Sequence, residues 1–121
     1  MKMQRRRLSI VVAGALALLL AVPVSAHAVF FPGTRLVELM REYEKSETGG
    51  KDVLWGNVGR FEGYIMGVCD ALDNSLVLLD RATPAQITAA VAKYLNANPQ
   101  RWNLPAIELV KLALLDSFPR R

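Results

Sequence analysis

The sequence predicts an all-α domain, a small bundle of about four helices that follows a cleaved signal peptide. Apolar residues recur at spacings of three and four in several segments, and polar stretches rich in Gly or Pro separate these segments. Strict apolar–polar alternation, which is typical of strands, does not appear after residue 28. The first 28 residues have a different composition from the rest.

Those first residues have the three parts of a secretory leader. Lys2 and the arginines at 5–7 give a charged start, residues 10–22 form a short apolar run, and Ala26-His27-Ala28 fits the small-x-small cleavage pattern. The run is shorter than the roughly 20 residues of a membrane-spanning helix, so no stable membrane anchor is expected. We therefore expect a signal peptide over 1–28, export to the periplasm, and one helical domain over 29–121.

Charge and cysteine content exclude several classes of protein. The chain has 15 Lys and Arg against 11 Asp and Glu, and the four cations of residues 1–28 are unmatched, so residues 29–121 are neutral overall. A neutral domain does not predict nucleic-acid binding. The single cysteine, Cys69, excludes an internal disulfide, so packing or oligomerisation must supply the stability.

The first helix is expected from a Thr34 cap to about Lys45, and a polar loop over 46–52 should follow it. The second helix is expected over 55–79. Its core face would be a large apolar stripe: Val58, Phe61, Ile65, Val68, Leu72, Leu76 and Leu79. Arg60, Glu62 and Asp70 lie on the opposite, polar face.

Small residues also fall at every fourth position of the second helix, at Gly59, Gly63, Gly67, Ala71 and Ser75. Residues four apart share one helix face, so they form a shallow groove. Each interior glycine costs about 1 kcal/mol relative to alanine, which predicts that another backbone approaches closely. The groove is expected to seat the apolar fourth helix, from this chain or from a second copy in a homodimer.

The third helix has a strong start signal, because Thr83 is a cap, Pro84 takes the first helical position and Gln86 completes a capping box. It should run to about Asn96, with Ile87, Val91, Tyr94 and Leu95 inward. The fourth helix should open at Leu104 or Pro105 and end near Phe118. It is apolar almost all round, which places it at the centre of the core or partly under a partner.

Little of the sequence supports catalysis, so we expect no enzyme. Cleavage after Ala28 removes the one histidine, and with it most schemes for a serine or cysteine nucleophile or a zinc site. Cys69 is expected to be a packing residue; the alternatives are an intermolecular disulfide and, least favoured, a catalytic thiolate. Asp70 and Asp73 are expected to be a solvated pair rather than catalytic acids. No cofactor and no metal site are predicted, and Tyr64 and Tyr94 read as core residues.

Protein binding is the better supported class of function. Trp102 and Arg101 lie in the connection before the fourth helix, and the residue types Trp and Arg are enriched in interface hot spots. The other interpretation of Trp102 is that its ring covers the core. For Trp55, burial in the core is favoured more strongly than for Trp102. The exposed loop with Gly49, Gly50 and Lys51 is the other candidate interface.

The order of several short patterns resembles the Rap1a/Tai immunity protein family. These are Gly63-Tyr64-Ile65-Met66-Gly67-Val68 with Asp70-Ala71, then Thr83 to Ile87, Lys93-Tyr94-Leu95, Asn98-Pro99, and finally Ala106 to Phe118-Pro119. The resemblance covers about residues 55–119. The family's two usual cysteines correspond to Phe61 and Arg120 here, so its disulfide is absent.

The resemblance implies a helical periplasmic protein, often a homodimer, that binds a peptidoglycan amidase delivered by type VI secretion. Surface segments would occlude the active site of that toxin. The alternative hypothesis is a general periplasmic helical protein, chaperone-like or structural, without a toxin partner. The lost disulfide and the apolar fourth helix are the features that favour this alternative.

Overall fold

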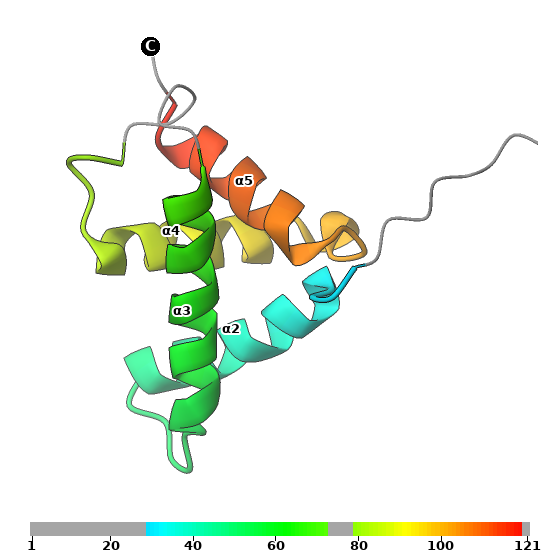
Figure 1. Ribbon diagram of the computed structural model, residues 1–121. Helices are drawn as coiled ribbons and strands as arrows, with labels where there is room; N and C mark the ends of the chain where they lie inside the picture. The colour runs from blue at the N-terminus through cyan, green and yellow to red at the C-terminus, as the bar shows by residue number, and fades with distance from the viewer. Residues whose placement is uncertain (1–28, 73–78, 120–121) are drawn as a thin grey trace, which may run out of the picture.

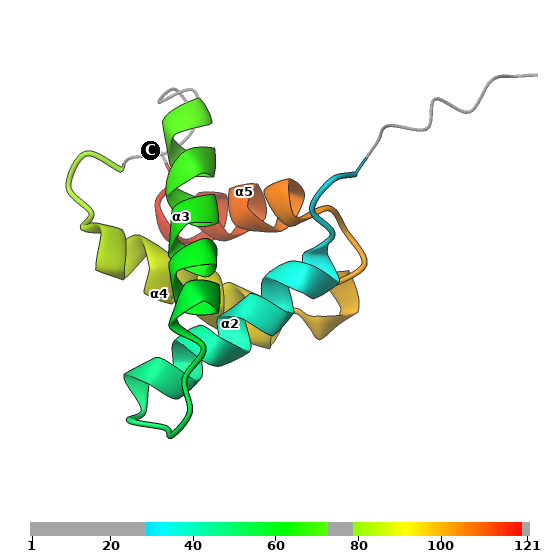
Figure 2. The ribbon, with the colours of Figure 1, turned by 60° about the horizontal axis from the view of Figure 1, so that its bottom comes forward.

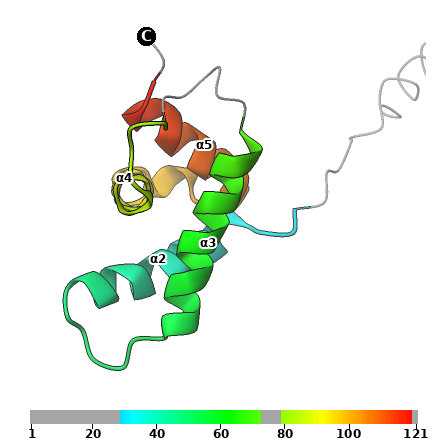
Figure 3. The same ribbon diagram turned by 60° about the vertical axis from the view of Figure 1, so that its left-hand side comes forward.

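The computed structural model describes residues 29–72 and 79–119, and this part of the chain is an all-α bundle, as predicted (Figures 1 to 3). The expected signal peptide lies outside the described residues. The elements are α2 (Gly33–Glu47), α3 (Trp55–Ala71), α4 (Pro84–Ala97), a single 3-10 turn η1 (Pro99–Arg101) and α5 (Ala106–Ser117).

Helix α2 begins earlier than the sequence predicted. Pro32 is its N-cap residue, and Thr34 lies inside the first turn without a capping bond, so the predicted Thr34 cap is wrong. The first helical donor is instead satisfied from outside the helix, because Gly33 N donates to the carbonyl of Leu104 at 2.9 Å. The buried apolar residues of α2 are Leu36, Val37, Leu39, Met40 and Tyr43.

Helix α3 buries the predicted stripe but ends earlier than expected. Its buried residues are Val58, Phe61, Ile65 and Val68. The helix stops at Ala71, and Leu72 has an extended backbone with ψ of 141°, so the prediction of a helix to Leu79 is wrong. Leu79 still packs partly against the core, whereas Leu76 and Ser75 lie outside the described residues. The apolar spacing therefore continues past the end of the helix.

The start of α4 agrees with the sequence in detail. Thr83 accepts a bond from Gln86 N at 3.2 Å, and the Gln86 side chain accepts one from Thr83 N at 2.9 Å, so both halves of the capping box are present. The helix ends at Ala97, one residue beyond the prediction. Helix α5 follows Pro105 and ends just before Phe118, also as predicted.

The core lies between two helix pairs. Helix α2 packs mainly on α3, and α4 packs mainly on α5. In the described part of the chain, α3 crosses in front of the other helices in Figures 1 and 2. Phe61 has no exposed surface and makes a tilted aromatic contact with Tyr43, with ring centroids 5.3 Å apart.

A short extended segment joins the N-terminal end of α2 to α5. The carbonyl of Phe31 accepts from Ala106 N at 3.0 Å, next to the bond between Gly33 and Leu104. The Phe31 ring stacks on Tyr64 of α3, with centroids 4.5 Å apart. These contacts hold the N-terminal end of α2 beside the connection between α4 and α5. The length of α2 therefore separates this connection from the loop that follows the other end of α2.

Candidate protein-binding surface

The loop between α2 and α3, residues 48–54, projects from the bottom of the molecule in Figure 1. It starts two residues later than predicted, because Ser46 and Glu47 still belong to α2. The helix ends in a Schellman-type turn, in which Gly49 has φ of 70° and Gly50 N donates to the Lys45 carbonyl at 2.8 Å. Glycine is favoured at position 49 because this turn requires a residue with positive φ.

Two side chains of α2 hold the rest of the loop. Lys45 Nζ donates to the carbonyl of Asp52 at 2.8 Å, and a Glu42 carboxylate oxygen accepts from Leu54 N at 2.9 Å. Glu42 and Lys45 also form an ion pair with 3.6 Å between Nζ and Oε2. The loop is thus tied to α2 at both ends, although Lys51 and Asp52 remain exposed.

The loop leads directly into two exposed apolar residues, Leu54 and Trp55, which we name the apolar tip. Their exposed fractions are 58% and 68%. The prediction that Trp55 leans toward the core is therefore wrong. Trp55 lies roughly a quarter-turn away from the buried stripe of Val58, Phe61 and Ile65, because successive helical residues are about 100° apart. That offset is the sequence signal that could have identified the tip.

The small residues of α3 form an open surface, which we name the glycine face: Gly56, Gly59, Gly63, Gly67 and Ala71. All are exposed, and a Cβ built on any of the four glycines would meet nothing within 4 Å beyond its chain neighbours and the nearby backbone of α3 itself. The expectation that the groove seats the fourth helix of the same chain is wrong. The glycine face lies on the side of α3 opposite the buried stripe, and α5 packs on the apolar side instead.

The connection between α4 and α5 holds the other predicted interface pair. The Trp102 indole donates to the Leu95 carbonyl at 2.8 Å, and the Arg41 guanidinium lies 5.9 Å from the ring centroid. Trp102 is half-buried against the core, which agrees with a lid. Arg101 is exposed, and it donates to the Tyr94 hydroxyl at 3.0 Å.

The structure does not bring the two predicted interface segments together. Loop 48–54 follows the C-terminal end of α2, whereas Trp102 lies beside its N-terminal end. A helix of 15 residues is about 22 Å long, so Lys51 and Trp102 belong to separate surfaces.

Cys69 of α3 is partly buried against the core. Burial raises the pKa of Cys69 above that of a free thiol, and the neighbouring Asp70 adds to this shift. A raised pKa lowers the thiolate fraction, so the residue is poorly activated as a nucleophile.

Within residues 29–72 and 79–119, no three His, Cys, Asp or Glu side chains group in a way that could hold a metal.

A family model describes most of the chain. The model of the Rap1a immunity proteins matches residues 34–119, which include all four α-helices of the described structure except the first residue of α2. The chain belongs to the Rap1a immunity protein family. The match begins upstream of the resemblance over 55–119, so the family pattern includes α2 and the loop that follows it. No curated protein and no solved structure matches the chain.

Family membership gives the chain a class of function, because the family consists of immunity proteins. Membership of this family implies a protein partner. Among the described helices, none is both long and apolar enough to cross a membrane.

Proposed function

We propose that this protein is a periplasmic immunity protein, which binds a type VI secretion effector with peptidoglycan amidase activity and occludes its active site. The observation that carries the proposal is the family match over residues 34–119. The sequence supports it further, because a predicted leader precedes the domain and residues 29–121 contain no histidine for catalysis.

We place the main contact at the apolar tip and loop 48–54. A segment that enters the cleft of an enzyme should project, remain rigid and carry a large apolar side chain. Loop 48–54 is held by Lys45 and Glu42, so little conformational entropy remains to be lost on binding. Trp55 supplies the aromatic anchor next to it.

The test is binding and protection with matched variants. Trp55→Ala should weaken binding to the effector by at least 2 kcal/mol, or about thirtyfold, as expected for a hot-spot tryptophan. Ile107→Ala is the control, because Ile107 is an exposed apolar residue on α5, away from the tip. Full binding by Trp55→Ala would contradict the location of the contact. Failure of the parent protein to protect cells from any amidase effector would contradict the function itself. If the protein then suppressed aggregation of unrelated clients, the chaperone-like alternative would be favoured.

We further propose that two copies pair through the glycine face of α3. The positions on this face are symmetric about Ile65, since Gly63 and Gly67 are equally far from it, as are Arg60 and Asp70. An antiparallel pair of α3 helices related by a two-fold axis would thus place glycine opposite glycine and Arg60 at the level of the partner's Asp70. Neither charge forms an ion pair within the described chain.

Reversing a charge tests this arrangement without adding a bulky side chain to the glycine face. Arg60→Asp should dissociate the dimer in light-scattering measurements of mass, and Arg60→Asp combined with Asp70→Arg should restore it. Gly63→Leu should also dissociate it, while the subunit stays folded because the site is open. A parent protein that is monomeric at micromolar concentration would contradict the proposal.

A further inference from the structure

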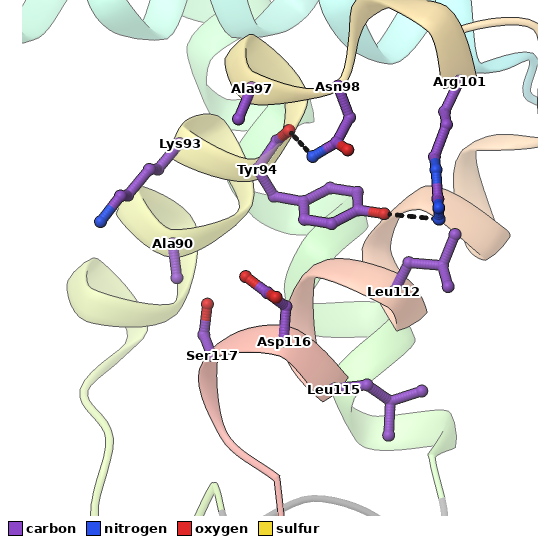
Figure 4. A pocket seen from close by; sticks show the side chains of 10 residues that line it. All are labelled: Ala90, Lys93, Tyr94, Ala97, Asn98, Arg101, Leu112, Leu115, Asp116 and Ser117. Carbon is purple, nitrogen blue, oxygen red and sulfur yellow. Dashed lines mark hydrogen bonds between the residues drawn. The ribbon is translucent and has the colours of Figure 1, made fainter.

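A pocket of about 630 Å³ opens between α4, η1 and the C-terminal half of α5 (Figure 4). Its volume is within the range of ligand-binding pockets, about 300–1,000 Å³. It lies on the opposite pair of helices from the apolar tip, and the contact proposed above does not use it.

A buried tyrosine sets the position of the main cation of this pocket. The Tyr94 ring is buried, and its hydroxyl accepts a bond from Arg101 Nη1 at 3.0 Å. The Asn98 amide donates to the Tyr94 carbonyl at 2.9 Å, which holds the start of η1 against the end of α4. One of the five N–H donors of the guanidinium is occupied by Tyr94, so the others remain for a ligand. Figure 4 shows the Tyr94 hydroxyl and Arg101 together at one end of the pocket.

The charges of the pocket are not matched within the described chain. Among the described cations, Arg35, Lys45 and Lys111 each pair with a glutamate three residues away, and the others, Arg60 among them, form no ion pair with a described residue. Arg101 and Lys93 line the pocket and form no ion pair with a described residue. Asp116 is the one acid among the lining residues, and Figure 4 shows it on the α5 side, away from Arg101. The lining therefore carries one excess positive charge.

Two leucines of α5 form one side of the pocket, with Leu112 near Arg101 and Leu115 further along the helix (Figure 4). Leu115 is a large exposed apolar residue. A planar guanidinium next to an apolar wall suits a carboxylate that is attached to an apolar body. A phosphate-rich ligand fits less well, because Asp116 would repel a second negative charge.

We propose that this pocket binds an acidic side chain of a protein or peptide segment, with the carboxylate on Arg101 and a neighbouring apolar side chain against Leu112 and Leu115. The small size of a free carboxylate such as acetate would leave the leucine wall uncovered. An acidic peptide with apolar neighbours uses both parts of the site.

The test titrates the protein, purified in its processed form, with three peptides of acetyl-Leu-X-Leu-amide, where X is Glu, Gln or Lys, and with acetate. Backbone amide NMR shifts report the binding site. The Glu peptide should give saturable shifts around residues 94–101 and 112–117, with affinity roughly tenfold or more above that of the Gln peptide. The Lys peptide should bind more weakly still. Acetate with equal affinity would contradict the role of the apolar wall, and no saturable shift with any peptide would contradict the site.

Variants separate this carboxylate site from a nonspecific basic patch. Arg101→Gln should abolish the preference for Glu over Gln, while Lys111→Gln, which removes an exposed cation of α5 outside the pocket, should leave it unchanged. Asp116→Asn should strengthen binding of the Glu peptide by roughly threefold, because it removes a like charge. Weaker binding by Asp116→Asn, or equal losses in Arg101→Gln and Lys111→Gln, would overturn the proposal.

Discussion

Gly33→Ala is the substitution whose effect follows most directly from the structure. A Cβ on Gly33 would lie 2.6 Å from Leu109 Cδ1 and 2.6 Å from the Trp102 carbonyl oxygen, and it would also collide with the Leu104 oxygen. Favourable carbon contacts are about 3.5–4.0 Å apart, so the neighbouring atoms must move by about 1 Å. Two of these atoms belong to the backbone, which a change of rotamer cannot move.

The expected cost has two parts. Overpacking of a well-packed site costs about 1–3 kcal/mol. The shift also weakens the bond from Gly33 N to the Leu104 carbonyl, now 2.9 Å, which contributes about 1 kcal/mol. We therefore expect Gly33→Ala to lower the free energy of unfolding by about 2–4 kcal/mol. For a domain of this size, such a loss lowers Tm by about 10–20 °C.

The assay is urea unfolding followed by far-UV circular dichroism, with Gly63→Ala as the matched control. The same methyl group enters open space at Gly63 of a single subunit, so at a protein concentration low enough to dissociate the proposed dimer it should stabilise α3 by about 0.5–1 kcal/mol through helix propensity alone. Two identical substitutions should thus change stability in opposite directions. A Gly33→Ala protein within about 0.5 kcal/mol of the parent would refute the reasoning, because it would show that the α4–α5 connection moves freely away from α2.

Three further predictions concern single residues. Thr83→Ala should lower the free energy of unfolding by about 1 kcal/mol in urea titrations, because it removes one half of the capping box, and no loss would show that the Pro84 turn starts α4 unaided. Cys69 should react more slowly with a thiol reagent in the native state than in urea, because burial raises its pKa; equal rates would contradict this. Burial, with smaller contributions from nearby glutamates, raises the pKa of Tyr43 above 10.0, so the unfolded chain loses that proton first. The contribution of Tyr43 to stability should stay constant below pH 10.0 and be lost as the pH rises from there through the folded-state pKa, so the stability of Tyr43→Phe should fall less steeply over that range.

Local signals predicted several elements well, and the start of α4 is the clearest case. Thr83, Pro84 and Gln86 act on one another within one turn, so no distant residue is needed to form the cap. The end of α3 shows the limit of such signals. The apolar spacing continues through Leu72 and Leu79, and periodicity cannot separate a helix from a chain that stays near the core after leaving the helix.

The candidate site was predicted in its residue types more than in its geometry. The exposed loop with Gly49, Gly50 and Lys51 follows from its composition, because glycines and charges disfavour burial. The exposure of Trp55 does not follow from composition, because it depends on which side of α3 the other helices cover. The hydrogen bond from Arg101 to the Tyr94 hydroxyl does not follow from composition either, because it depends on how η1 folds back on α4.

The sequence by itself determined that Val58, Phe61, Ile65 and Val68 share one side of a helix and that the small residues share another, since 3.6 residues per turn fix both sets. Only the tertiary structure decided which side is buried. Both sides could have packed, one through apolar area and the other through close backbone approach, and the other helices cover the apolar one. Close backbone packing occurs instead at Gly33, where α2 meets the connection between α4 and α5, and no local pattern marks that contact because its partners lie about 70 residues away in the chain.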